Sequence, residues 1–406
     1  MKMRKVRGKN GEAIIYTDRV EVEALDQVKL MLDNQITEAA QVRMMPDIHM
    51  GKGATIGTTI KLPEDRQRWK ICPNVIGVDI GCSVSAVKIA EKDIDLEKLD
   101  QTVIKTIPTG FSVHAKSLDG AFVEGLNLRM VIHHSDRVSK SLGTLGGGNH
   151  FLELGKDEEG NHWFMAHTGS RNLGKQVAEF YQDLAERNFK GLSGTERKRV
   201  IQELKDQGRQ HEISARIEAL SKGAGKDTPD NGLEYLMAEQ LDDYLHDMAA
   251  AQRFAQENHH HILTQVVEAM GWHEIDRFVS THNFIDLDHG IIRKGATSAQ
   301  AGERLIIPLN MRDGSLICVG KGNPHWNFSA PHGAGRKMSR RQAKESIQMQ
   351  AFAEAMEGIY SSSINESTLD EAPFAYKDIQ DIVGNISDTV DILHLVKPIW
   401  NHKGSN

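Results

Sequence analysis

The chain begins with a stretch whose apolar residues follow helical spacing. In "VEALDQVKLMLDN" (residues 22–34), Val28 stands three or four positions from Leu25, Met31 and Leu32. This spacing places the four side chains on one face of a helix. We therefore predict a helix here that packs one face against a core.

The pattern then changes to short runs of apolar and β-branched residues separated by glycine. Such runs occupy residues 44–62, 74–90, 277–296 and 302–320, and they predict strands joined by glycine turns. Residues 172–271 are polar, poor in glycine and helical in pattern. We expect one α+β domain over residues 1–406, with residues 172–271 as a helical insertion. Strands from both glycine-rich portions would build a cleft, with helices packed outside.

Composition narrows the class of protein. The chain has 406 residues, 39% of them hydrophobic, which is ample for a large buried core. A net charge of −7 gives no general attraction for nucleic acid, so an anionic substrate needs local positive charge. Three cysteines make no disulfide framework. The sequence has neither a signal peptide nor an apolar run of membrane-spanning length, so we expect a cytoplasmic protein.

Local positive charge follows a glycine turn in "SAPHGAGRKMSRRQAKE" (residues 329–345). Glycines after His332 let the backbone approach a ligand closely. Ser339 and Gln342 have the spacing of a capping box, which predicts a helix that begins there. We interpret Arg336, Lys337, Arg340 and Arg341 as local positive charge that favours an anion beside this helix start; the alternative is a solvated helix face.

Residues of metal-ligand type occur at glycine turns and at the ends of predicted strands: Asp79 and Cys82 in "GVDIGC", His150 in "GGGNHFLEL", His167 in "WFMAHTG" and His282 in "FVSTHNFI". Each alone has an ordinary explanation, as a turn cap, a small buried thiol or a hydrogen-bonded histidine. Together, one thiolate with imidazoles and a carboxylate suits zinc, manganese, iron or cobalt. One cysteine among histidines is unlike a structural zinc site.

The remaining histidines and glycine motifs are weaker evidence for a catalytic or binding site. We interpret His259, His260 and His261 as the solvated surface of a polar helix. The chain has no HExxH or CxxC spacing and no phosphate-binding GxxxxGK[ST] loop, and its loose glycine motifs are weak evidence for a nucleotide site.

Eight motifs in order resemble the RtcB family of RNA-splicing ligases. They are "MPDIHMGKGATIG", "GVDIGC", "LGTLGGGNHFLEL", "HTGSRNLG", "THN", "RKGA", "SAPHGAGRKMSR" and "APFAYKDI", and the resemblance runs from about Met45 to Lys403. It implies an RNA ligase that depends on GTP and manganese. Such an enzyme joins RNA ending in a 3′-phosphate or 2′,3′-cyclic phosphate to RNA beginning with a 5′-hydroxyl, in tRNA splicing or RNA repair.

The resemblance also implies roles for individual residues. His332 would attack the α-phosphate of GTP and carry GMP. Cys82 would bridge two manganese ions, one completed by Asp79 and His150 and the other by His167 and His282. Tyr376 is expected to stack near the guanine. With this resemblance, the four basic residues Arg336, Lys337, Arg340 and Arg341 are interpreted as an RNA contact. The residues expected to contact GTP are Asn149, His150, Phe151, Leu152, Glu153, His282, Asn283, Pro308, Asn310, Met311, Ser315, His332, Gly333, Ala334, Gly335, Tyr376 and Lys403.

Two segments depart from the family's pattern. Ser83 and Val84 follow "GVDIGC" where Gly-Met is expected, and "PLNMRDGS" (residues 308–315) stands where many relatives have Pro-Gly-Ser-Met-Gly. Asn310 could replace a serine hydroxyl as a donor. Neither departure removes a metal ligand or the nucleophile, so we expect activity with an altered substrate preference.

Three alternatives remain open. One is a paralogue specialised for repairing a particular broken RNA. The second is a metal-dependent phosphoesterase that opens cyclic phosphates without ligation and needs neither His332 nor GTP. The third is a non-catalytic RNA-binding protein. We expect a monomer, and an activating protein partner stays open.

Overall fold

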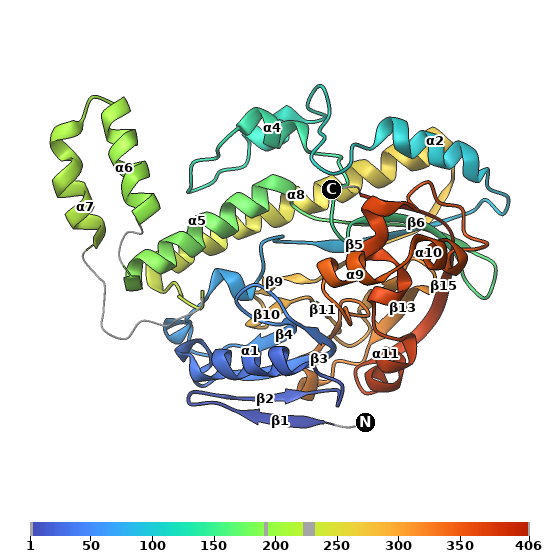
Figure 1. Cartoon of the computed structure of the whole chain (residues 1–406), viewed down its shortest axis with the longest axis horizontal. Helices are drawn as coiled ribbons and strands as arrows, with labels where there is room; N and C mark the ends of the chain where they lie inside the picture. The colour runs from blue at the N-terminus through green and yellow to red at the C-terminus, as the bar shows by residue number, and fades with distance from the viewer. Residues whose placement is uncertain (1–2, 191–193, 222–231, 405–406) are drawn as a thin grey trace.

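The structure is a computed structural model that describes residues 3–190, 194–221 and 232–404. It combines two large β-sheets and a small two-stranded sheet with helices packed on their outer faces (Figure 1). The single α+β architecture expected from the sequence is confirmed. Residues 191–193 and 222–231 of the predicted helical insertion lie outside the described residues.

The first sheet has six strands and contains the N-terminal hairpin. Its spatial order is β1 (Arg4–Arg7), β2 (Glu12–Ile15), β3 (Gln41–His49), β4 (Ile56–Lys61), β10 (Ile291–Lys294) and β9 (Asn283–Asp286). Only the β2–β3 pair of this sheet is parallel. Strands β9 and β10 come from the second glycine-rich portion of the sequence, so the two portions meet in this sheet.

The second sheet has seven antiparallel strands. Its spatial order is β12 (Arg304–Asn310), β13 (Gly314–Gly320), β15 (Val390–Lys403), β6 (Phe151–Lys156), β7 (His162–Thr168), β5 (Ser83–Ile89) and β8 (Glu274–Thr281). Arg304 on edge strand β12 forms an ion pair with Asp276 on the opposite edge strand β8. The sheet is therefore curled, and its two edges adjoin.

The small sheet pairs β11 (Ala296–Ser298) with β14 (Ser329–Pro331). The amide of Ala296 donates to the carbonyl of His282, which separates β8 from β9 where the chain passes from the second sheet to the first. Both sheets and the small sheet therefore meet around His282.

Helices cover the outer faces of the sheets (Figure 1). Helices α5 and α8 lie side by side and hold Tyr181 against Tyr244, with ring centroids 5.1 Å apart. Ile262 and Val266 of α8 share a core with Phe164 of β7 and Val87 of β5. The α-helices are α1 (Val22–Asp33), α2 (Leu96–Thr106), α3 (Gly120–Glu124), α4 (Ser135–Lys140), α5 (Arg171–Lys190), α6 (Gly194–Asp206), α7 (Ile213–Ser221), α8 (Ala238–Met270), α9 (Arg340–Ser346), α10 (Met349–Ala355) and α11 (Ile379–Ile386).

Several local predictions are confirmed. Helix α1 buries Val28, Met31 and Leu32 as its spacing indicates. Ser339 caps α9, and Gln342 completes the capping box. Residues 44–62, 277–296 and 302–320 form strands and turns as predicted.

The prediction of a strand before "GVDIGC" is wrong. Residues 73–75 form a 3-10 helix (Pro73–Val75) instead, and β5 begins only at Ser83. Gly77 and Gly81 have φ values of +110° and +72°, a backbone conformation that interrupts a strand ladder. The apolar run is therefore a buried loop, and it carries Asp79 and Cys82.

The interpretation of residues 259–261 as solvated surface is wrong for His259. His259 is 1% exposed, its Nδ1 lies 2.6 Å from Ser85 Oγ and its Nε2 lies 3.0 Å from the carbonyl oxygen of Thr168. Helix α8 packs on the second sheet, so one residue of any three in a row faces that sheet. His260 is exposed, as expected.

Most of the described part of residues 172–271 is helical. Helices α5 and α8 contribute to the main cores, whereas α6 and α7 project from one end (Figure 1). That this segment is an insertion stays a prediction. Among the described residues, no helix combines the length and the apolar character needed to span a membrane.

Candidate active site

Four residues of metal-ligand type lie at one end of the second sheet. Cys82 immediately precedes β5, His150 precedes β6, His167 is near the end of β7 and His282 follows β8. These strands are antiparallel neighbours in the order β6, β7, β5, β8, so the starts of β5 and β6 coincide with the ends of β7 and β8. The topology therefore gathers side chains that are far apart in the sequence.

The gathered side chains form two groups that share Cys82, one with Asp79 and His150 and the other with His167 and His282. Cys82 Sγ lies 3.3 Å from His167 Nε2 and 3.6 Å from His150 Nε2. His150 Nε2 lies 2.9 Å from Asp79 Oδ2, and His167 Nε2 lies 3.3 Å from His282 Nε2. The structure thus divides the five predicted ligands into the same two sets that the resemblance implies.

Backbone carbonyls orient two of the imidazoles. His150 Nδ1 lies 2.9 Å from the carbonyl oxygen of Leu145, and His167 Nδ1 lies 3.2 Å from that of Asn149. A carbonyl oxygen can only accept, so each Nδ1 donates a proton, and Nε2 is the ring atom left for a metal ion. Both Nε2 atoms face the shared thiol, the arrangement that a metal ion requires.

The electrostatics of the group also fit a divalent ion. Burial lowers the pKa of His167 and of His282, which keeps both rings neutral. Burial, reinforced by Asp79, raises the pKa of the Cys82 thiol; a bound dication would reverse this and stabilise the thiolate. Asp79 Oδ1 is buried and has no hydrogen-bond partner among the described residues. The residues present therefore suit two ions that share a thiolate.

His332 lies beside this group, directly after β14. Its Nδ1 is 2.7 Å from Oδ2 of Asp47, whose side chain is fully buried, and its ring centroid is 4.9 Å from that of His282. Gly335 has a φ of +74°, and a Cβ at this position would lie 2.3 Å from the carbonyl oxygen of Asp47. Glycine is thus required where the turn passes Asp47, and the carboxylate leaves the Nε2 lone pair of His332 free.

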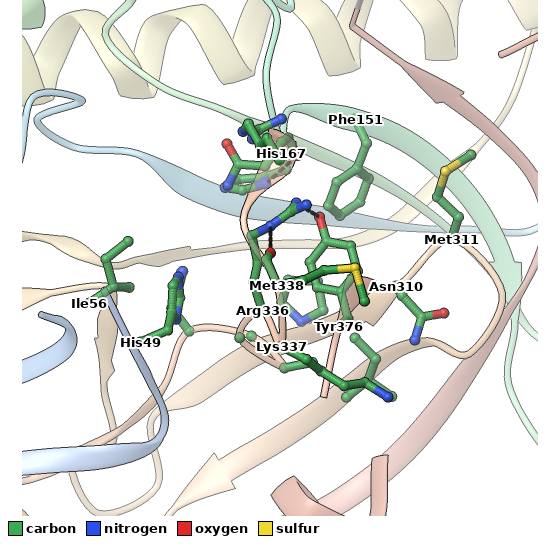
Figure 2. A pocket seen from close by; sticks show the side chains of 18 of the residues that line it. His49, Ile56, Phe151, His167, Asn310, Met311, Arg336, Lys337, Met338 and Tyr376 are labelled. Atoms are coloured by element: carbon green, nitrogen blue, oxygen red, sulfur yellow. Dashed lines mark hydrogen bonds between the residues drawn. The ribbon is translucent and has the colours of Figure 1, made fainter. Parts of the chain in front are cut away.

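A cleft of about 690 Å³ opens next to His332 and is lined from both glycine-rich portions of the chain (Figure 2). Phe151 and Glu153 of β6 point into it, whereas Leu152, between them, is fully buried in the core behind the sheet. Only the backbone of Leu152 can therefore serve the cleft. The residues predicted to contact GTP that line this cleft are Asn149, Phe151, Glu153, Pro308, Asn310, Met311, His332, Gly333, Ala334, Gly335, Tyr376 and Lys403.

The remaining predicted GTP contacts lie around the cleft. His282 and Asn283 line a smaller cavity of about 230 Å³, which His332 and Asn149 also border. His150 lies in the group with Asp79 and Cys82, and Ser315 is buried with its hydroxyl 3.3 Å from Glu153 Oε1.

The turn at residues 308–315 differs from the expectation for Asn310. Asn310 Oδ1 accepts from the amides of Arg312 and Asp313, and its Nδ2 donates to Asp313 Oδ2 at 2.7 Å. These bonds hold the side chain within its own turn, where it lies at the edge of the cleft (Figure 2). One Nδ2 hydrogen is left for a ligand, so Asn310 is a weaker substitute for a serine hydroxyl than the sequence indicated.

The four basic residues predicted to bind RNA have different surroundings. Arg336 and Arg340 turn inward and pair with the buried Glu371. Arg341 is exposed and pairs with Glu345, while Lys337 is exposed at the cleft. Lys337 and Arg341 are therefore the more accessible to RNA phosphates.

Sequence reasoning missed four charged residues near the site. Asp47 lies within a quoted motif but reads as an ordinary turn aspartate. Arg171 is largely buried, and burial lowers its pKa, partly offset by Asp79. Lys294 donates from Nζ to the carbonyl oxygen of Asn74 at 2.6 Å, and burial lowers its pKa to about 8. Glu371 follows another acid in an unremarkable polar run. All four residues are largely or fully buried, and the local sequence gives no indication of that burial.

Comparison with known proteins agrees with the site. Residues 34–131 and 119–404 match the family described as tRNA-splicing ligase RtcB. The chain is 31% identical to RNA-splicing ligase RtcB1 of Escherichia coli, over 89% of this chain and 90% of that protein. It is 28% identical to tRNA-splicing ligase RtcB of Aeropyrum pernix, over 97% of this chain and 95% of that protein. The motifs, the fold and these matches place the chain in the RtcB family of tRNA-splicing ligases.

Proposed function

We propose that this protein is an RNA ligase that uses GTP and manganese to join RNA ends through a histidine–GMP intermediate. The substrate ends are a 3′-phosphate or 2′,3′-cyclic phosphate and a 5′-hydroxyl. The observation that carries this proposal is the position of His332, which Asp47 orients at the boundary between the two Cys82-sharing groups and the 690 Å³ cleft.

The geometry of His332 supports a nucleophilic role. Asp47 holds the proton on Nδ1, so Nε2 presents a lone pair. In the proposed step, Nε2 attacks the α-phosphorus of GTP, an N–P bond forms, and the bond to the bridging oxygen breaks to release pyrophosphate. The imidazole becomes positively charged as the N–P bond forms, and the carboxylate of Asp47 stabilises that charge.

Two further transfers complete the proposed reaction. An oxygen of the RNA 3′-phosphate attacks the GMP phosphorus, and the N–P bond breaks to restore His332. The 5′-hydroxyl of the second RNA then attacks the activated 3′-phosphorus and releases GMP. Manganese held by Asp79, Cys82, His150, His167 and His282 would supply neutralisation of phosphate charge. Lys403 at the cleft adds a fixed positive charge.

The experiment is intact-protein mass spectrometry after incubation with GTP and manganese. Wild type should gain the mass of one GMP, and His332→Ala should gain none. His332 belongs to neither Cys82-sharing group, so the variant should still bind wild-type amounts of manganese. RNA pairs with 3′-phosphate and 5′-hydroxyl ends should then be joined, whereas pairs with 3′-hydroxyl and 5′-phosphate ends should not. Opening of a cyclic phosphate by a metal-loaded wild type that forms no adduct would instead favour the phosphoesterase alternative.

A further inference from the structure

A buried carboxylate at the side of the cleft binds four donors. Glu371 is 2% exposed, and its Oε1 accepts from Arg336 Nη1 at 3.2 Å and Arg340 Nη1 at 2.8 Å. Its Oε2 accepts from the Tyr376 hydroxyl at 2.6 Å and from Lys403 Nζ at 2.9 Å. We call Glu371 and these four partners the Glu371 cluster.

The four partners of Glu371 come from three segments between residues 336 and 403, and all of them line the cleft. Arg336 follows the glycine turn after His332, Arg340 begins α9, and Lys403 ends β15. The Arg336 guanidinium also covers the ring of Tyr376 at 5.1 Å from its centroid (Figure 2). One carboxylate therefore sets the positions of a ring and three cations that face the same space.

Charge balance indicates that Glu371 is ionised. Burial alone would raise its pKa, but Lys403, Arg340 and the hydroxyl of Tyr376 outweigh burial and lower the pKa to about 2. Asp370 adds a second carboxylate, which pairs with Arg340 and Lys344. Two carboxylates thus face four cations, namely Arg336, Arg340, Lys344 and Lys403, and the positive surplus that remains favours a phosphate-bearing ligand. The surplus is held in place before any ligand arrives, which reduces the ordering cost of binding.

Asp370, the acid next to Glu371, has different hydrogen-bond partners. Asp370 is also 2% exposed, but its carboxylate accepts from Arg340 at 2.7 Å and pairs with Lys344 at 3.4 Å. Neither carboxylate oxygen of Asp370 contacts Tyr376 or Lys403 among the bonds described. Two adjacent buried acids thus differ in whether they reach the cleft-lining ring and lysine.

We propose that Glu371 is a positioning residue for GTP, which fixes Tyr376 and Lys403 in the nucleotide-binding part of the cleft. The role rests on the proposed function, because it assumes that the cleft takes GTP. Glu371 does not contact the reacting atoms; it acts through the residues it orients. Its loss should therefore weaken nucleotide binding while the chemistry at His332 is retained.

The test compares Glu371→Gln with Asp370→Asn, two matched acid-to-amide changes. Calorimetry in the His332→Ala background, with manganese present, measures GTP affinity without adduct formation. Charge-assisted hydrogen bonds contribute enough that losing them should raise the Kd of Glu371→Gln roughly 10- to 100-fold. Asp370→Asn should stay within about twofold of its parent. Each variant should still bind two manganese ions, which a collapsed site would not.

A second measurement separates binding from chemistry. In the wild-type background, the rate of GMP-adduct formation at several GTP concentrations should show a raised KM and a nearly unchanged maximal rate for Glu371→Gln. If Glu371→Gln does not fold, Glu371→Asp keeps the charge but withdraws the carboxylate by one methylene, and it should also raise the Kd.

Three results would overturn the proposal. They are an unchanged Kd in the folded Glu371 variant, an equal loss of affinity in Asp370→Asn, and absence of GTP binding by the parent protein. The proposed function fails separately: GTP that binds with Glu371-dependent affinity but forms no adduct on wild type would refute the ligase mechanism and leave the positioning role standing.

Discussion

Asp47 and His332 are 285 positions apart in the sequence, yet the carboxylate oxygen of one lies 2.7 Å from the ring nitrogen of the other. We predict that Asp47→Asn slows transfer of GMP to His332. The amide has nearly the same shape as the carboxylate, but it carries no negative charge. It can also donate to Nδ1, which would move the ring proton to the attacking Nε2.

The magnitude follows from the type of bond. A hydrogen bond to a charged partner contributes about 1.5–3 kcal/mol, and each 1.36 kcal/mol in the barrier is tenfold in rate. If the full contribution is lost in the transition state, the rate falls roughly 10- to 150-fold. Asp47 is fully buried, so water cannot readily replace the carboxylate, and the upper part of this range is expected.

The assay is single-turnover formation of the GMP adduct at saturating GTP and manganese, followed by intact mass. Asp47 belongs to neither Cys82-sharing group, and it does not line the cleft. The variant should therefore bind two manganese ions and should have a GTP affinity close to that of its parent. Asp247 of α8 is another fully buried aspartate, which accepts from the hydroxyl of Tyr181 on α5. Asp247→Asn controls for loss of a buried charge away from His332.

The reasoning would be refuted by an Asp47→Asn adduct rate within twofold of wild type. A rate loss that equals the loss in Asp247→Asn would be just as damaging, because it would reflect general destabilisation. A rate loss accompanied by loss of manganese would show that Asp47 supports the metal group rather than the orientation of His332.

Three further predictions concern the metal group, Glu153 and the core. Cys82→Ala removes the ligand common to both groups, so manganese bound per chain should fall from two to near zero by elemental analysis, whereas Asp79→Asn should retain about one. Burial raises the pKa of Glu153 to about 8, above its ordinary 4.5, so the folded state retains a proton that the unfolded state releases. As the pH rises from about 4.5 to 8, the unfolding free energy of the metal-free wild type should therefore decrease relative to that of Glu153→Gln, by up to about 1.4 kcal/mol per pH unit. Denaturant titrations that give the same pH dependence for both proteins would contradict this. His259→Ala leaves a cavity and removes the hydrogen bonds to Ser85 and to the carbonyl oxygen of Thr168, so it should cost about 2–4 kcal/mol of stability. The exposed His260→Ala should cost under about 0.5 kcal/mol, and equal unfolding midpoints for the two variants would contradict the burial argument.

Features that depend on neighbours a few positions away could be predicted from the sequence. The spacing around Val28 specified the buried face of α1, and Ser339 with Gln342 specified where α9 begins. The residue types Asp79, Cys82, His150, His167 and His282 indicated a metal site before any geometry was known. Their division into two sets came from the family resemblance, since no local pattern contains it.

Predictions from local sequence were wrong where backbone conformation, helix packing or a hydrogen bond within a turn changed the outcome. The apolar run before Cys82 resembles a strand, but the positive φ of Gly77 and Gly81 keeps it a loop. Helical spacing could not reveal that His259 faces the second sheet, because the run of polar residues around it does not indicate which side of the helix is buried. Asn310 looked free to donate, but its own turn occupies most of its hydrogen-bonding capacity.

By itself, then, the sequence determined the secondary structure that spacing and caps encode, and the residue types available for chemistry. Beyond the groups that the family resemblance implies, only the tertiary structure decided which of them meet. It paired Asp47 with His332 and placed four cleft-lining groups around Glu371. Asp47 and His332 are 285 positions apart, and the partners of Glu371 lie 5 to 35 positions from it. Both sets of contacts depend on how strands and loops pack together and on burial. Local propensities extend over only a few residues, so they carry no information about such partners.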